Sequence, residues 1–199
     1  MLLVNSKSVL KMYMWRTVGN DGLECGQLWR DEQHWIMNGT ILRLSDSGPA
    51  EVRYEITCDA RWRTRSANIS CQNVQGKREL RISRDDDGWH ANGNRLQLPG
   101  DCTDVDLEWS PSTNTLPIRR LQLNVGSDSG PLTAAWIRLP ELSVEALQQT
   151  YERTGPRAYT YGSHGGSFKA NLTVDDDDLI IDYAEVWERI GKRTMRGSR

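Results

Sequence analysis

Several patterns that mark common protein classes are missing from this sequence. No segment approaches the roughly 20 apolar residues that a membrane-spanning helix needs, and there is no P-loop or nucleophile elbow. The three histidines, His34, His90 and His164, are isolated and show no zinc-site spacing, so we expect neither a metal nor a cofactor. Lys and Arg number 25 against 27 Asp and Glu, and without a basic excess we expect no nucleic-acid partner.

An export signal and paired cysteine motifs are also missing. Polar residues interrupt the apolar N-terminal stretch, and no small-residue cleavage site follows it. The four cysteines form no CxxC pair. We therefore expect reduced thiols and a cytoplasmic protein. Residues 1–10 and 192–199 are expected to form flexible ends of a single domain over residues 1–199.

The aromatic residues are dominated by types with a polar tip, because eight Trp and six Tyr stand against one Phe. Trp and Tyr combine a large apolar body with a hydrogen-bonding group, and they suit the lining of a wet pocket better than Phe does. This composition favours an amphipathic cavity. The alternative is that these side chains only fill the core.

Short alternating runs separated by turn residues dominate the chain. The clearest is residues 51–58, where Val52, Tyr54, Ile56 and Cys58 alternate with polar side chains, as in a half-buried antiparallel strand. About ten or eleven such runs predict a mainly β protein. We expect one large antiparallel sheet curled into a barrel or half-barrel, with one or two helices.

The predicted helices lie in the last third of the chain. Residues 143–154 begin with Ser143 as a candidate N-cap and carry Val144, Leu147 and Tyr151 at helical spacing, with Gly-Pro directly after them. Residues 184–190 are a candidate for a second, short terminal helix.

Residues 104–120 combine carboxylates with two guanidiniums. Asp104 and Asp106 share one face of a predicted strand, because alternate strand residues point the same way. A proline-containing turn over residues 110–117 follows, and then Arg119 and Arg120 lead into a second predicted strand. Such a hairpin would hold a polar site at one end of the sheet; the alternative is an ordinary surface salt bridge.

These residue types suit recognition of a polar ligand. Arginines offer forked donors to phosphate, carboxylate or sugar hydroxyls, carboxylates and amides accept from hydroxyls, and aromatic rings pack against sugars or acyl chains. The candidate ligand-binding residues are Arg63, Arg65, Asp104, Asp106, Asn114, Arg119, Tyr159 and Tyr161. Two alternatives remain open: a carbohydrate-active hydrolase that uses Asp104 and Asp106 as paired carboxylates, and a protein-interaction module. Whether the chain is an enzyme is therefore undecided from these residues.

Several motifs together resemble the bacterial "putative glycolipid-binding" family. They are WRTR at 62–65, DVDL at 104–107, SPSTNTLPIRRL at 110–121, YTY at 159–161 and DYAEVW at 182–187, and the resemblance extends over about residues 15–190. It implies a mostly antiparallel, barrel-like β fold that has been likened to lipoprotein carriers. The eight candidate residues fall in the family's motif positions. The expected function is non-enzymatic binding of a small amphiphile such as a glycolipid, with its apolar part enclosed by the curled sheet and its head group held by arginines and aspartates.

Overall fold

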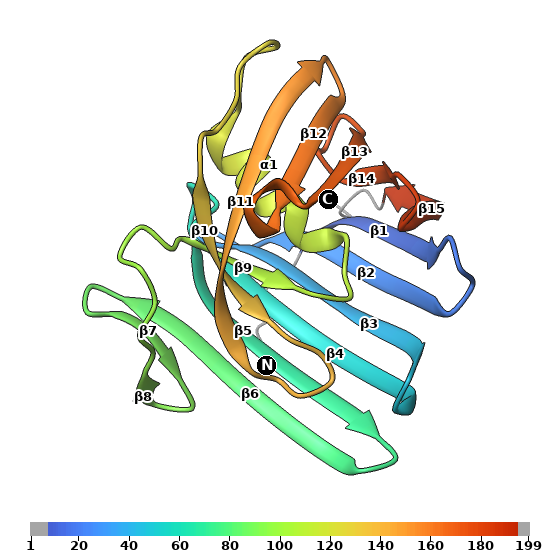
Figure 1. Ribbon diagram of the computed structural model, residues 1–199, viewed down its shortest axis with the longest axis vertical. Helices are drawn as coiled ribbons and strands as arrows, with labels where there is room; N and C mark the ends of the chain where they lie inside the picture. The colour runs from blue at the N-terminus through green and yellow to red at the C-terminus, as the bar shows by residue number, and fades with distance from the viewer. Residues whose placement is uncertain (1–7, 195–199) are drawn as a thin grey trace, which may run out of the picture.

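The computed structural model describes residues 8–194, in which 15 strands form one sheet (Figure 1). The strands of the first half are β1 (Ser8–Thr17), β2 (Gly22–Arg30), β3 (Trp35–Ser45), β4 (Gly48–Cys58), β5 (Thr64–Asn73), β6 (Gly76–Asp85), β7 (Gly88–Ala91) and β8 (Asn94–Arg95). Those of the second half are β9 (Asp104–Leu107), β10 (Leu132–Ile137), β11 (Val144–Gly155), β12 (Ala158–Ser163), β13 (Phe168–Val174), β14 (Ile180–Tyr183) and β15 (Trp187–Thr194). The prediction of a mainly β fold is confirmed.

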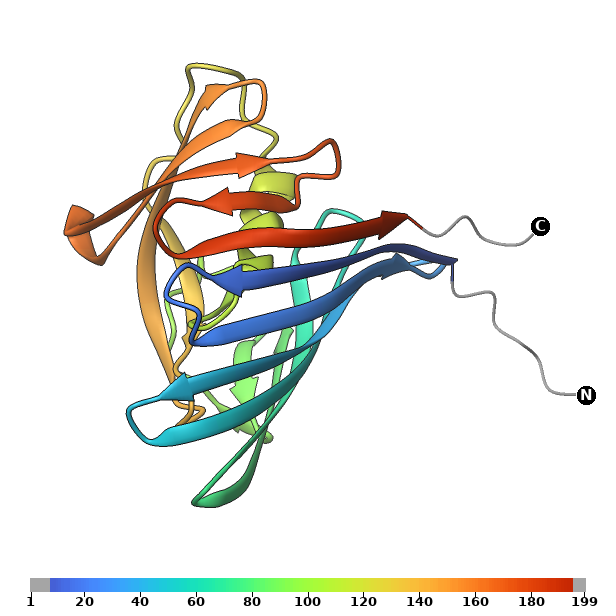
Figure 2. The same cartoon turned by 90° about the vertical axis from the view of Figure 1, so that its right-hand side faces the viewer.

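The sheet consists of two meanders that meet at the first and last strands. Its order is β8-β7-β6-β5-β4-β3-β2-β1-β15-β14-β13-β12-β11-β10-β9. The chain therefore starts in the middle, runs out to β8, crosses to β9 and returns to β15 beside β1. All neighbours pair antiparallel except β9 and β10, which pair in parallel. The sheet is not closed but curled, as a half-barrel is (Figure 2).

The curl brings the β9 edge back towards the inner face of the first meander. The backbone amide of Val105 in β9 donates to Oγ1 of Thr64 in β5 over 3.3 Å. Both residues are buried. An edge strand normally leaves unpaired backbone groups, and here the side chain of a strand on the opposite side of the curl binds one of them.

A short helical segment fills the concave side of the sheet (Figure 2). It consists of the 3-10 helix η1 (Ser112–Asn114) and the helix α1 (Thr115–Leu121), and a further 3-10 turn, η2 (His164–Gly166), lies between β12 and β13. Residues 111–118 are all buried. Leu116 and Ile118 join the apolar residues of both meanders in one core. The segment thus acts as an internal plug of the half-barrel.

The predicted hairpin around this segment is wrong. The strand carrying Asp104 and Asp106 is present as β9, but Arg119 and Arg120 lie in the last turn of α1 and not in a second strand. Pro117 is the third residue of α1, and proline is tolerated in the first turn because amides there have no intrahelical partner. The prolines therefore begin a helix where we predicted a turn.

Both helices predicted in the last third are also wrong. Residues 143–154 fall almost entirely in β11, in which Leu147, Gln149 and Tyr151 alternate as buried residues. β11 pairs on both sides, with β10 and β12, and these long-range hydrogen bonds override the helical spacing of its apolar residues. Residues 184–190 form a turn followed by β15.

Two further differences concern β2 and the chain ends. We did not predict β2, which pairs along its whole length with β3. Of the ends that we predicted to be flexible, residues 8–10 belong to β1 and residues 192–194 to β15, and their flexibility stays a prediction; residues 1–7 and 195–199 lie outside the described part of the chain. Within the described residues, no helix is both long and apolar enough to cross a membrane.

Candidate functional site

Two hollows lie near the two ends of the internal plug. The first, which we call the inner cavity, has a volume of about 210 Å³. Its lining residues are Asp106, Leu107, Glu108, Ser110, Asn114, Trp136, Leu147, Tyr161, Ser163, His164, Phe168, Tyr183, Val186 and Trp187. The second, the arginine–tryptophan cleft, has a volume of about 610 Å³. It is lined by Arg30, Trp35, Ala60, Arg61, Trp62, Arg63, Thr103, Arg119, Arg120 and Gln122.

The deep part of the inner cavity is built around the carboxylate of Asp106 on β9. Oγ1 of Thr113 in η1 donates to Oδ1 of Asp106 over 2.9 Å, and the side-chain amide of Gln149 on β11 donates to Oδ2. Burial raises the pKa of Asp106 to about 6, while these two hydrogen bonds act against the rise. The carboxylate is held firmly and still has acceptor capacity, because two oxygens offer about four lone-pair sites.

Other polar groups around Asp106 are ordered by the same network. Nε2 of Gln149 also donates to the hydroxyl of Tyr161 over 3.0 Å. The hydroxyl of Tyr151 donates to Oδ1 of Asn114 over 2.9 Å. In contrast, the hydroxyl of Tyr183 has no hydrogen-bond partner in residues 8–194 of the structure. The cavity thus presents a fixed acceptor beside a donor that is free to bind a ligand.

The mouth of the inner cavity is aromatic, and an imidazole and a guanidinium lie against one of its rings. Phe168 at the start of β13 is 37% exposed, and Trp136 on β10 is half-buried. The imidazole of His164 meets the edge of the Trp136 ring with centroids 5.3 Å apart, and the guanidinium of Arg138 lies 4.2 Å from the centroid of that ring. A ligand entering here would pass from aromatic side chains to a polar floor.

A second buried carboxylate, Glu24 on β2, lies on the other side of η1. The hydroxyl of Tyr54 donates to its Oε1 over 2.5 Å and lies 3.0 Å from Oγ of Ser112. Oε2 has no hydrogen-bond partner among the described residues. Burial raises the pKa of Glu24 to about 7, against the hydrogen bonds from Tyr54, Ser110 and Ser112. Glu24 is therefore often protonated near neutral pH, because its charged form is poorly solvated.

Glycines place Tyr54 over Glu24. Gly26 and Gly39 are cross-strand partners on β2 and β3, and the rings of Tyr13 and Tyr54 lie over them from β1 and β4. A Cβ atom at residue 39 would lie 2.7 Å from the hydroxyl oxygen of Tyr54. Only glycine leaves room for the ring to cover the neighbouring strand and reach the carboxylate.

The arginine–tryptophan cleft gathers five guanidiniums, and no Asp or Glu lines it. Three of them have carboxylate partners behind the cleft surface: Arg63 binds Asp59, Arg119 lies 3.4 Å from Asp178, and Arg120 binds Asp104. Arg30 and Arg61 form no ion pair within the part of the chain that the structure describes. The cleft therefore carries excess positive charge.

A bulge in β5 explains why the cleft can hold Arg63. The β4–β5 pairing shifts from Thr57–Ser66 to Cys58–Thr64, so that Arg65 has no opposite residue. Because of this extra residue, the buried side chains of β5 next to the bulge are Ala67 and Thr64, three residues apart. Arg63 and Arg65, on either side of Thr64, are half-buried. Both bind Oδ2 of Asp59, at 2.9 and 3.2 Å, so these arginines avoid the apolar face that simple alternation predicts for them.

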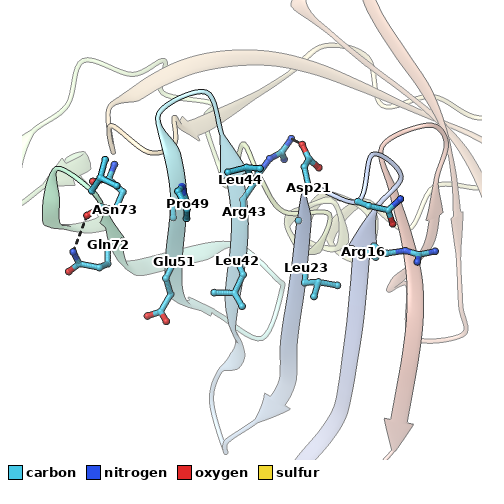
Figure 3. A pocket seen from close by; sticks show the side chains of 14 residues that line it. Arg16, Asp21, Leu23, Leu42, Arg43, Leu44, Pro49, Glu51, Gln72 and Asn73 are labelled. Atoms are coloured by element: carbon cyan, nitrogen blue, oxygen red, sulfur yellow. Dashed lines mark hydrogen bonds and ion pairs between the residues drawn. The ribbon is translucent and has the colours of Figure 1, made fainter.

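A third hollow, of about 790 Å³, is an open groove beside the turns that connect β1 to β2, β3 to β4 and β5 to β6 (Figure 3). Leu23 and Leu42 are cross-strand partners that lie side by side on its outer surface. Arg43 faces Asp21 at 3.6 Å across its rim. Its polar residues are exposed or half-buried, so it lacks a buried polar floor like that of the inner cavity.

The structure separates the predicted site residues into three groups. Asp106, Asn114 and Tyr161 line the inner cavity, whereas Arg63 and Arg119 line the arginine–tryptophan cleft. The other three line neither hollow: Asp104 binds Arg120, Arg65 binds Asp59, and Tyr159 packs against the guanidinium of Arg153 at 5.7 Å.

Sequence reasoning missed several residues of these sites. Tyr183 and Trp187 lie within the DYAEVW motif, but neither was a candidate residue, and Trp187 lies in the helix predicted over residues 184–190. Trp136 gave no signal of its own beyond the abundance of Trp. Glu24 was missed because a charged residue on the buried face of LECGQLW breaks the alternation that identifies a strand.

Comparisons with known proteins agree with this fold and with the resemblance. A family model described as "Putative glycolipid-binding" matches residues 12–189. A crystal structure of a DUF1089 family protein from Pseudomonas aeruginosa is 32% identical and superposes with a TM-score of 0.75 over 84% of this chain and 92% of that chain. No curated protein matches the chain at a comparable level of significance.

Proposed function

The chain belongs to the family described as "Putative glycolipid-binding", and from that premise we propose that it binds a small amphiphile with a hydroxyl-rich head group, such as a glycolipid, without chemical turnover. The inner cavity receives the head group. The observation that carries this proposal is the pairing of a fixed, half-buried acceptor, Asp106, with the unpartnered hydroxyl of Tyr183 in one cavity. A sugar hydroxyl both donates and accepts, and it matches such a pair.

The size and lining of the inner cavity suit the head group of the ligand and not the whole ligand. Its volume of about 210 Å³ is below the roughly 300–1,000 Å³ of sites that enclose a whole drug-sized ligand. The apolar part of the ligand would therefore leave the cavity at its mouth, against Trp136, Leu147 and Phe168. The interior of the half-barrel beyond the cavity is filled by the plug and the core.

The hydrolase alternative has less support in the site geometry. It needs two carboxylates that flank one bond, and we considered Asp104 and Asp106 for these roles. Asp104 is 4% exposed, is bound by Arg120 and does not line the inner cavity. Glu108 lines the cavity, but its Oε2 accepts from the backbone amide of Leu139 and its Oε1 lies 3.3 Å from Arg138.

We place this binding function in the cytoplasm. The supporting observation is that Cys25, Cys58, Cys71 and Cys102 are all free thiols. Proteins of oxidising compartments commonly contain disulfides, whereas cytoplasmic proteins keep their thiols reduced.

Calorimetric titration with monomeric octyl β-glucoside tests the proposed function. Tyr183→Phe removes one hydrogen-bonding group and should weaken binding about fivefold. Trp136→Ala removes the apolar contact at the mouth and should weaken it about tenfold or more. Leu42→Ala, on the outer surface, is the matched control and should leave affinity unchanged. Equal affinity in all four proteins, or no heat of binding in any, would contradict the proposal.

A further inference from the structure

We propose that the arginine–tryptophan cleft is a second binding site, specific for a phosphoryl group, and that it works independently of the inner cavity. The two sites share no lining residue. They lie near opposite ends of the plug: Ser110 and Asn114 line the inner cavity, whereas Arg119, Arg120 and Gln122 line the cleft. The phosphoryl group is carried by a small organic phosphate or by a lipid head group.

Stacked rings hold two of the cleft's guanidiniums in place. The rings of Trp35 and Trp62 are stacked with centroids 4.6 Å apart and an interplanar angle of 22°. Arg30 lies 5.0 Å from the centroid of Trp35 on β3, and Arg119 lies 5.0 Å from that of Trp62. Stacking on aromatic faces orients a guanidinium without using its N–H groups, so the donors stay available for a ligand.

The hydrogen bonds that these arginines do make leave donors free. Nε and Nη2 of Arg119 donate to the carbonyl oxygen of Asp177, at 3.1 and 2.8 Å. Nε and Nη2 of Arg120 donate to Asp104. In each case Nη1 has no partner among residues 8–194. In Arg63 only Nε has a side-chain hydrogen bond, to Asp59. Arg63, Arg119 and Arg120 are thus each held through Nε, or through Nε and Nη2, and keep other N–H groups free for a ligand.

The charge of the cleft matches a doubly charged oxyanion. Arg30 and Arg61 add two positive charges that no carboxylate of the described chain pairs with, while the other three lining arginines pair with Asp59, which Arg65 shares, and with Asp104 and Asp178. A phosphate monoester carries a charge of about −1.5 to −2 at pH 7 and three strong acceptor oxygens. Several guanidinium forks around one hollow recognise such a group better than they recognise a single carboxylate.

Binding assays with defined phosphates test this site. Calorimetry with inorganic phosphate and with glucose 6-phosphate covers soluble sources. Co-sedimentation with phosphatidylcholine vesicles, with and without phosphatidic acid, covers a lipid source. We expect one phosphate per chain in the soluble arm, or binding that depends on phosphatidic acid in the vesicle arm. Either result supports the site and identifies the source; no binding in either arm would overturn it.

Charge variants locate the binding. Arg30 and Arg61 are exposed, so the double variant Arg30→Gln/Arg61→Gln should fold normally and lose about tenfold or more in affinity. Arg95→Gln removes an exposed arginine on β8, outside the cleft, and is the matched control. An equal loss in both variants would show binding to overall charge and overturn the proposal. Tyr183→Phe should not change phosphate binding, and the double variant should not change octyl glucoside binding, so the two sites can fail separately.

Discussion

Arg120 on α1 and Asp104 on β9 form a buried ion pair that fastens the plug to the sheet. Nε and Nη2 of Arg120 lie 3.1 and 2.7 Å from the two carboxylate oxygens, and the side chains are 18% and 6% exposed. Arg120→Leu leaves a buried carboxylate without its partner, and we expect the free energy of unfolding at pH 7 to fall by about 3 kcal/mol. Urea unfolding followed by circular dichroism measures this.

The double variant Asp104→Leu/Arg120→Leu should recover most of that loss, because no charge is then left buried. Arg95→Leu, at an exposed residue without an ion pair in the described chain, should change stability by less than about 0.5 kcal/mol. If Arg120→Leu behaves like Arg95→Leu, the ion pair does not anchor the plug.

The buried Glu24 makes stability depend on pH in the direction opposite to ordinary acid denaturation. Its pKa rises from 4.5 to about 7 in the folded protein, so the folded state binds the proton more tightly than the unfolded state does. Glu24 therefore lowers stability as the pH rises from about 4.5 to about 7. Glu24→Gln mimics the protonated acid, and it should be more stable than the wild type at pH 7.5 by up to about 3 kcal/mol.

The comparison is made by urea unfolding at several pH values between 4.5 and 7.5. The advantage of Glu24→Gln should shrink to a few tenths of a kcal/mol (about 0.4) near pH 4.5, where the unfolded wild type is half protonated and the folded wild type holds the proton. Glu55→Gln, at an exposed position on β4, is the control and should follow the wild type. A constant difference across this range would contradict a raised pKa at Glu24.

Gly39 should be intolerant of a methyl group. A Cβ atom there would lie 2.7 Å from the hydroxyl oxygen and 2.8 Å from two ring carbons of Tyr54, which holds Glu24. Displacement of this buried ring should lower the free energy of unfolding by about 1–3 kcal/mol. Gly100→Ala, where a Cβ would meet nothing within 4 Å, should change stability far less. Thermal unfolding compares the two variants.

The strand pattern of the first half could be read from the sequence because its residues alternate regularly. In β4, Val52, Tyr54, Ile56 and Cys58 are all buried, as the alternation predicts. β2 could not be read in this way, since Glu24 lies on its buried face. Such an exception depends on partners from elsewhere, here Tyr54, that a local pattern does not contain.

The plug and β11 show a second limit of local reasoning. Pro117 and the surrounding Ser and Thr residues are typical of turns, yet the segment becomes helical inside the half-barrel, where Leu116 and Ile118 pack in the core. The spacing of Val144, Leu147 and Tyr151 suits a helix, but pairing with two strands distant in sequence decides the outcome. The candidate residues were found individually, but their division between two hollows depends on this plug.

The central claim, that the inner cavity holds the head group of an amphiphile, is tested most directly by native mass spectrometry of the freshly purified protein. We expect a species with one added mass per chain, and solvent extraction should release an amphiphile of that mass with a hydroxyl-rich head group. Trp136→Ala should lose it, whereas Leu42→Ala should keep it. A bare chain in all three proteins, with no complex formed when octyl β-glucoside is supplied, would contradict the claim.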